Sequence, residues 1–228
     1  MATFIADRVQ QVLERIHAAE RVAGRTNGAV SLVAVSKTQT DEAIRIAAAA
    51  GQLAFGENYL QEALAKQDAL ADLPELIWHF IGPIQSNKTR PIAERFDWVH
   101  TVDRLRIAER LSQQRPADKP PLNVCLQVNI SEEASKSGVS LAALPELAAA
   151  VAQLPRLRLR GLMTIPAPAN GLAQQRMPFR ILREAMTSLA LPGLDTLSMG
   201  MSDDLEAAIL EGATLVRVGT ALFGPRSG

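Results

Sequence analysis

Short apolar runs alternate with segments of helical periodicity along the whole chain. An amphipathic helix is predicted first, because apolar residues recur at helical spacing from Ile5 to Ile16, ahead of Gly24. Eight apolar runs then follow, at 32–35, 53–55, 77–81, 98–101, 122–128, 157–162, 196–198 and 214–218. A parallel strand covered on both faces need not alternate, so we interpret these runs as buried strands.

Helical patterns separate the predicted strands and carry recognisable boundary residues. They cover residues 41–50, 59–70, 88–95, 104–115, 141–153, 179–189 and 203–210. Thr40, Asp103 and Ser202 stand where N-caps are expected. Pro178 lies close to the expected start of the helix at 179–189, which leaves the geometry of the loop at 170–178 open.

Eight strands that alternate with helices predict a parallel sheet, either a closed barrel or an open doubly wound sheet. The chemically unusual residues favour the barrel, because they cluster just after strands, where barrel enzymes build their sites. They are Lys37, Asn58, Gly82, 198–202 and 217–220. With no break in composition, residues 1–228 are expected to form one α/β domain, a single (β/α)₈ TIM barrel with an extra N-terminal helix.

Composition narrows the function. Lys plus Arg number 24 and Asp plus Glu number 24, and aromatic residues make up 4%, so nucleic-acid binding is disfavoured. The single cysteine, Cys125, excludes an intramolecular disulfide and is expected to be a buried strand residue. The three histidines lack the spacing of metal ligands. With neither a secretory signal pattern at residues 1–7 nor a membrane-length apolar run, we expect a cytoplasmic protein that touches no membrane.

Lys37 stands at the end of the first apolar run, where a lysine loses hydration. Desolvation disfavours the charged form and lowers the pKa of a lysine, which is how many Schiff-base lysines are activated. Taken alone, Lys37 is explained more simply as a lysine that extends its amine from a strand end into solvent. Its chemistry depends on the residues that the fold brings beside it.

The segment 197–204 has the chemistry of a phosphate site. It runs from a strand through Gly200 into a helix, and free N–H groups at a helix start bind anions. An ordinary serine-capped turn explains Ser202 but not Ser198 or Gly200. The carboxylates at 203–204 oppose an anion, so they are expected to point outward.

The last strand adds a second anion-binding segment. Gly219 allows the backbone to approach a ligand, and Thr220 supplies a hydroxyl and an N–H group. Barrels often bind phosphate with the loops after strands seven and eight. By parity, Arg217 points away from its neighbours Val216 and Val218 and into the barrel. Because a guanidinium only donates hydrogen bonds, it would leave the ring nitrogen of any bound pyridine ligand unprotonated. An unprotonated pyridine ring is a poor electron sink for carbanion chemistry.

Three weaker features remain open. Asn58 follows the second strand and either bonds a ligand hydroxyl or only shapes a turn. His79, between two aromatic residues, is expected to be a core histidine. The segment 127–138 is expected to be a solvated loop, with Lys136 as an alternative cation at the rim of the site.

Several blocks of sequence, in fixed order along nearly the whole chain, resemble the pyridoxal phosphate homeostasis protein family. They are 32–37, 55–58, 78–82, 85–88, 127–129, 159–163, 197–204 and 216–224. The resemblance implies a fold similar to the N-terminal barrel of bacterial alanine racemase and of eukaryotic ornithine decarboxylase. It also implies that pyridoxal 5′-phosphate forms a Schiff base with one lysine, Lys37.

The same resemblance implies the remaining contacts with the cofactor. Arg217 would approach the pyridine nitrogen, and Asn58 would lie near the ring. The phosphate would be held by Ser198, Ser202, Gly219 and Thr220. The implied set of binding residues is Lys37, Asn58, Ser198, Met199, Ser202, Arg217, Gly219 and Thr220.

Two functions from different classes fit these residues. One is a carrier that buffers the cofactor and hands it to apo-enzymes, and the other is a small amino-acid racemase or decarboxylase. A lysine aldolase without cofactor is a third, more distant fit. Catalytic relatives take a second acid–base group from another domain or subunit, whereas this sequence ends four residues after Gly224 and has one tyrosine, Tyr59. We therefore expect a carrier, and a neutral barrel of this kind is expected to be a monomer.

Overall fold

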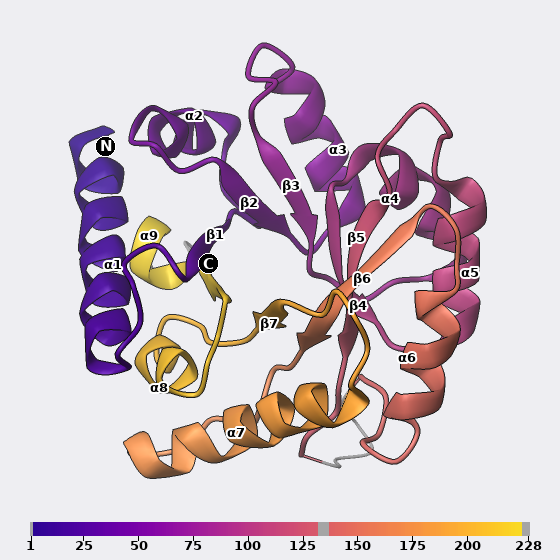
Figure 1. Cartoon of the computed structure of the whole chain (residues 1–228). Helices are drawn as coiled ribbons and strands as arrows, with labels where there is room; N and C mark the ends of the chain where they lie inside the picture. The colour runs from indigo at the N-terminus through magenta and orange to yellow at the C-terminus, as the bar shows by residue number, and fades with distance from the viewer. Residues whose placement is uncertain (1, 132–136, 225–228) are drawn as a thin grey trace.

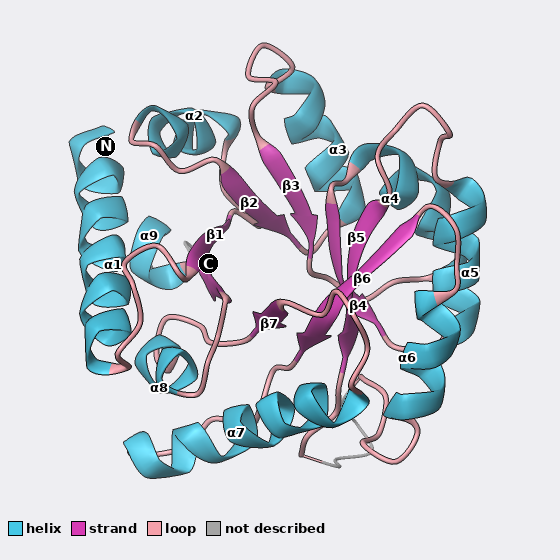
Figure 2. Ribbon diagram, in the orientation of Figure 1, coloured by secondary structure: helices cyan, strands magenta, loops and turns pink. Residues whose placement is uncertain are grey.

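The computed structural model describes residues 2–131 and 137–224, and within them eight parallel strands close into one barrel, as predicted. Figure 1 shows the chain running around this barrel, and Figure 2 shows strands enclosed by helices. The strands are β1 (Ser31–Val35), β2 (Ala54–Glu57), β3 (Ile77–Phe80), β4 (Trp98–Val102), β5 (Leu122–Gln127), β6 (Leu157–Met163), β7 (Thr196–Ser198) and β8 (Leu215–Val218).

Helices cover the outer face of the strands. They are α1 (Ala2–Val22), α2 (Asp41–Ala49), α3 (Leu60–Ala69), the 3₁₀ turn η1 (Ser86–Lys88), α4 (Thr89–Arg95), α5 (Leu105–Gln114), α6 (Leu144–Ala152), α7 (Leu172–Leu189), α8 (Leu205–Leu210) and α9 (Thr220–Phe223). Because both faces of the strands are covered, burial is nearly continuous along them, which is why the strands lack alternation in sequence.

The barrel closes between β1 and β8, whose pairing places Val33 opposite Arg217. The helix after β8, α9, has only four residues and cannot cover this seam alone. The predicted extra helix, α1, covers it instead: it packs against α2, α8 and α9, and Figure 1 shows it beside all three. Its apolar stripe, which includes Val9 and Ile16, is fully buried.

The predicted N-caps have mixed outcomes. Thr40 caps α2, and its hydroxyl accepts a hydrogen bond from the N–H of Ala43 at 3.2 Å. The predictions for Asp103 and Ser202 are wrong, because the following helices begin one or two residues later than expected. Their N-caps are Arg104 and Asp204, neither of which makes a side-chain capping bond.

Helix α7, in contrast, begins earlier than predicted, at Leu172, and runs through Pro178. A proline inside a helix removes one N–H donor and costs about 3 kcal/mol, so Pro178 misleads a boundary prediction. Packing offsets this cost, because Phe179 and Leu182 on the same helix are fully buried. The stretch 172–178, expected to be loop, is therefore helix.

Two predictions about buried residues are confirmed. Cys125 is fully buried in β5, and burial raises the pKa of its thiol to about 12. His79 is buried in β3 and stacks on Trp98, with 5.5 Å between the ring centroids. Among the described helices, none is long and apolar enough to span a membrane.

Candidate functional site

A cavity of about 200 Å³ opens at the carboxyl ends of β1, β7 and β8. Five of the residues singled out in the sequence line it: Lys37, Ser202, Arg217, Gly219 and Thr220. They come from the segments after β1, β7 and β8, and closure of the barrel between β1 and β8 brings the first segment beside the other two. The cavity occupies the end of the barrel where such folds place their sites.

Lys37 reaches this cavity because β1 ends two residues earlier, at Val35. Val35 also lines the cavity, and alternation along an extended chain gives Lys37 the same direction. The next residue, Thr38, has a φ of 64°, in the left-handed region, and Gln39 after it lines the cavity again. The lysine side chain is half-buried.

The loop after β7 brings Ser202 to the cavity. Gly200 has a φ of 95°, and a Cβ atom there would lie 2.6 Å from the Cβ of Ala208, so the loop requires glycine at this turn. The N–H of Met201 donates to Asp204 Oδ1 at 2.6 Å, which tightens the turn. Ser202 Oγ accepts a hydrogen bond from the N–H of Ala221 at 3.3 Å and so joins this loop to α9.

The two acidic residues of this loop behave differently. Asp204 is directed into the turn, and burial raises the pKa of its carboxyl. Asp203 is exposed but lines the rim of the cavity, so the expectation that both carboxylates point away from it is only half right. Lys37 and Arg217 supply two positive groups against this one rim carboxylate.

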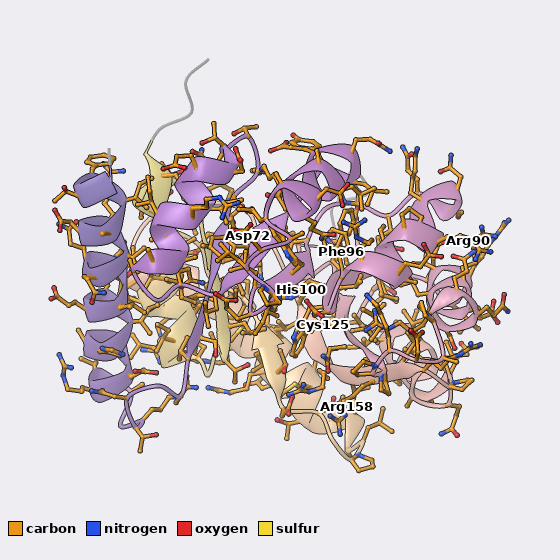
Figure 3. The ribbon with its side chains drawn as sticks, turned by 90° about the horizontal axis from the view of Figure 1, so that it is seen from above. Asp72, Arg90, Phe96, His100, Cys125 and Arg158 are labelled. Atoms are coloured by element: carbon orange, nitrogen blue, oxygen red, sulfur yellow. The ribbon has the colours of Figure 1, made fainter. Side chains whose placement is uncertain are left out.

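Arg217 forms the floor of the cavity and heads a chain of buried hydrogen bonds across the barrel. Its guanidinium donates to Ser198 Oγ at 2.6 Å and to the carbonyl of Thr164 at 3.0 Å. Ser198 Oγ lies 2.7 Å from His100 Nδ1, and His100 Nε2 lies 2.9 Å from His79 Nδ1. Figure 3 shows His100 in the interior of the molecule, as expected for a residue in the middle of this series of hydrogen bonds.

Burial decides the charge of each group in this chain. Desolvation lowers the pKa of His79 to about 3 and that of His100 well below its ordinary value, so both imidazoles are neutral. Desolvation also lowers the pKa of Arg217, to about 10, which leaves the guanidinium charged at neutral pH. Because an arginine side chain only donates hydrogen bonds, Ser198 Oγ accepts from Arg217, and its own proton is free for donation to His100 Nδ1. The donors in this series of hydrogen bonds therefore all point away from Arg217.

Three predicted binding residues, Asn58, Ser198 and Met199, lie outside the lining of this cavity. Ser198 is fully buried in the barrel interior, and its hydroxyl is engaged by Arg217 and His100. Met199 is fully buried in the hydrophobic core, and its N–H donates to the carbonyl of Leu215. Ser198 is the last residue of β7 and Met199 directly follows it, so both side chains lie beneath the cavity rather than in its lining.

Asn58 lies at a neighbouring cavity of about 480 Å³, which shares Met201 with the first. Its Oδ1 atom is buried and has no hydrogen-bond partner among the described residues. Gly82 allows this placement, because a Cβ atom at position 82 would lie 2.1 Å from the carbonyl oxygen of Asn58. A buried acceptor without a donor is costly, so Asn58 is suited to accept from a ligand.

Three residues near the site are not predicted from the sequence. No local pattern marks His100 or Glu57 as part of the site, whereas Lys66 lies on the buried face of α3 with Leu60 and Ala63. Helical spacing was the signal that could have revealed it. Lys136 lies outside the described residues. Within the described ranges, no group of three or more His, Cys, Asp or Glu residues could hold a metal ion.

The fold and the cavity place the chain in the class of the alanine racemase N-terminal domain, a family that matches residues 10–227. An alanine racemase from Corynebacterium glutamicum has the same fold, with a TM-score of 0.69 and 20% identity. This chain covers 62% of that racemase. The likeness at this level concerns the fold alone.

Nearer relatives define the family more narrowly. The pyridoxal phosphate homeostasis protein of Pseudomonas aeruginosa is 67% identical over 222 residues, which cover 97% of this chain and 96% of the relative. The structure of PipY from Synechococcus elongatus with PLP bound gives a TM-score of 0.83 at 40% identity, covering 96% of this chain and 100% of PipY. The chain belongs to the pyridoxal phosphate homeostasis protein family.

Proposed function

We propose that this protein binds pyridoxal 5′-phosphate as a Schiff base on Lys37 and carries it in vitamin B6 homeostasis. The observation that carries the proposal is that Lys37, Arg217 and the segments after β7 and β8 line one cavity. The name of the Pseudomonas aeruginosa relative and the PLP-bound structure of PipY support it. When bound, the cofactor would supply an aldehyde carbon that condenses with the Lys37 amine to form a C=N bond, with release of one water.

The residues that line the cavity, together with Asn58 at the neighbouring cavity, fit each part of this cofactor. Ser202, Gly219 and Thr220 would hold the phosphate, since Gly219 keeps the backbone open and the hydroxyls donate to phosphate oxygens. Arg217 would donate to the pyridine nitrogen and keep it unprotonated. The buried Oδ1 of Asn58 would accept a hydrogen bond near the ring. Ser198 and Met199 would act from below, by holding Arg217 and the β7 loop in place.

We propose a carrier rather than a racemase or decarboxylase. An unprotonated pyridine ring stabilises a carbanion poorly, which disfavours both reactions. The only tyrosine of the sequence, Tyr59, is 55% exposed and lines a groove with Asn58 and Lys88 rather than the Lys37 cavity, which disfavours it as a second acid–base group. The names of the curated relatives, which are homeostasis proteins, agree with this choice. The carrier would act in the cytoplasm as a monomer that delivers the cofactor to apo-enzymes.

The proposal is tested by replacing the lysine. Lys37→Ala is expected to abolish the visible absorption band that pyridoxal phosphate produces with the protein, while circular dichroism shows the fold intact. Borohydride reduction of the wild type, followed by peptide mass spectrometry, should place the adduct on Lys37. Lys119→Ala serves as control, because Lys119 contacts the carbonyl of Glu94 at the opposite end of the barrel. A band that survives in Lys37→Ala, or a wild type that stays colourless with the cofactor, would contradict the proposal.

A further inference from the structure

An ion cluster, buried except for the partly exposed Glu62, lies between β2 and α3, beside the segment that carries Lys37. Its members are Lys66, Glu57 and Glu62, and the side chains of Lys66 and Glu57 are 7% and 0% exposed. Lys66 Nζ lies 2.8 Å from Glu57 Oε1 and also contacts Glu62 Oε1. Its third contact is the carbonyl oxygen of Ser36, at 2.6 Å. These three acceptors match the three protons of an ammonium group.

Both chain neighbours of Lys37 are held by this cluster. On one side, Ser36 Oγ donates to Glu57 Oε1 at 2.7 Å, and the Ser36 carbonyl accepts from Lys66. On the other side, the N–H of Thr38 donates to Glu62 Oε1 at 2.5 Å. The backbone of Lys37 is therefore held from before and after by groups that share one cation.

The conformation at Thr38 needs such support. Its φ of 64° lies in the left-handed region, which a β-branched residue rarely adopts. Strained residues of this kind persist where the surroundings hold them, and they cluster at functional sites. The bond from Thr38 to Glu62 provides that hold directly beside Lys37.

The cluster is a poor means of stabilising a fold. Glu57 Oε2 is buried without a hydrogen-bond partner among the described residues, and burial raises the pKa of Glu57 even though Lys66 and Ser36 oppose the rise. Apolar residues of the same volume usually stabilise a protein as well as a buried ion pair does. The cluster instead fixes local geometry, because two of its bonds hold backbone atoms next to Lys37, the carbonyl oxygen of Ser36 and the N–H of Thr38.

We propose that Lys66, with Glu57 and Glu62, positions Lys37 for its reaction with the aldehyde of pyridoxal phosphate. This inference rests on the function proposed above. Lys66 is a positioning residue, because it acts through Ser36 and Thr38 and lies outside the cavity. The same bonds keep the amine of Lys66 occupied by acceptors of the protein itself.

The first test compares two buried cations. Lys66→Met is expected to weaken the binding of pyridoxal phosphate about tenfold and to slow Schiff-base formation, because a small displacement of a reacting group has a large kinetic cost. Arg115→Met is the matched control: Arg115 is equally buried and binds the carbonyls of Ala93 and Phe96, but at the opposite end of the barrel. Both variants should lose thermal stability, whereas only Lys66→Met should change the absorbance titration. Equal cofactor binding in the two variants would overturn the proposal.

A second test needs no buried substitution. Glu62→Met removes the acceptor for Thr38 and should also weaken binding, whereas Glu62→Gln keeps a carbonyl acceptor and should bind nearly as the wild type does. Adding Thr38→Gly to Glu62→Met should restore binding, because glycine adopts positive φ without strain. If Glu62→Met binds as the wild type does, or if Thr38→Gly restores nothing, the positioning role is wrong.

These outcomes are separable from failure of the proposed function. If Lys37 does not hold the cofactor, the wild type itself forms no borohydride-stable adduct at Lys37. If Lys37 holds it but the cluster has no role, the wild type forms the adduct and all of the cluster variants form it with the same affinity and rate.

Discussion

At the scale of single residues, Ser198 joins the cation under the cavity to the neutral histidines of the barrel interior. Its hydroxyl is shared by Arg217 and His100 and is shielded from water. Arg217 retains its bond to the Thr164 carbonyl if Ser198 is lost, but one guanidinium N–H and one imidazole nitrogen would then lack partners. Such buried groups carry the full cost of desolvation.

We therefore expect Ser198→Ala to lower the free energy of unfolding by about 1–3 kcal/mol and to weaken cofactor binding through Arg217. Urea unfolding and an absorbance titration measure the two effects. Ser188→Ala is the control: Ser188 is exposed on α7 and bonds the Ala185 carbonyl within its own helix, so a change within about 0.5 kcal/mol is expected. A Ser198→Ala variant as stable as the Ser188→Ala control would contradict this role.

The buried histidines predict a dependence of stability on pH. Burial lowers the pKa of folded His79 to about 3, whereas an unfolded histidine has a pKa of about 6.5. The unfolded chain thus binds more protons between these values. The stability contributed by neutral His79 is fully present above about pH 6.5 and is lost as the pH falls toward 3. His100 acts in the same direction.

We expect the free energy of unfolding to fall with pH below about 6.5, by up to about 1.4 kcal/mol per pH unit for each such histidine. His79→Gln should be less stable at neutral pH, since it loses the stacking on Trp98, but should show a shallower slope. Urea unfolding at several pH values from about 7 to about 5 measures the slope. Identical slopes in the variant and the wild type would contradict the prediction, because they would show that the pKa of His79 is the same in the folded and unfolded states.

At the scale of elements, α7 shows how packing overrides a local signal. Pro178 predicts a helix start near residue 179, and the helix instead begins at Leu172 because the buried side chains of Phe179 and Leu182 hold it against the barrel. The strands, in contrast, begin and end within about two residues of their predicted bounds. A strand that is buried on both faces is apolar along nearly its whole length, so its apolar run marks its bounds in the sequence.

Pro178→Ala should restore a helical N–H donor and raise the free energy of unfolding by about 1–2 kcal/mol, the gain being reduced by the freer unfolded chain. Pro145→Ala is the matched control, because Pro145 lies in the first turn of α6, where a proline costs no helical hydrogen bond. That variant should be no more stable than the wild type. Denaturant unfolding of both variants checks the difference, and a destabilised Pro178→Ala would mean that the proline ring packs productively.

At the scale of the whole molecule, α1 packs against the last two helices of the structure, α8 and α9, and one of its side chains contacts a loop of the site. It covers the seam between β8 and β1, where α9 is too short to cover the outer face of the closed barrel. From α1, Arg15 pairs with Glu206 at 2.8 Å and donates to the carbonyl of Ser202 at 2.9 Å. The first helix of the chain thus supports a loop that closes the cavity almost two hundred residues later.

Arg15→Met should weaken pyridoxal phosphate binding about threefold to fivefold, the equivalent of one hydrogen bond of about 1 kcal/mol. The expected cause is a looser β7 loop around Ser202. Arg45→Met is the control, since Arg45 pairs with Asp72 and the Ala69 carbonyl at the surface, away from the cavity. An absorbance titration of both variants decides the question, and equal affinities would show that the loop holds itself.

The sequence alone determined the barrel, the extra N-terminal helix and most of the cavity. Hydrophobic periodicity records burial, and burial defines strands and helices one segment at a time. The residues that line the cavity could be named because each follows a strand, where parallel barrels gather their chemistry. Lys37 and Arg217 are examples, and the structure places both in one cavity.

Only the tertiary structure decided how side chains from distant segments meet. Nothing local indicates that Ser198 lies beneath the cavity rather than in it, or that Lys66 spans from α3 to the Ser36 carbonyl. Such contacts depend on strand register and on closure of the barrel, which set distances between residues far apart in the chain. Periodicity carries no information about those distances, because it reports how deeply a residue is buried and not what it is buried against.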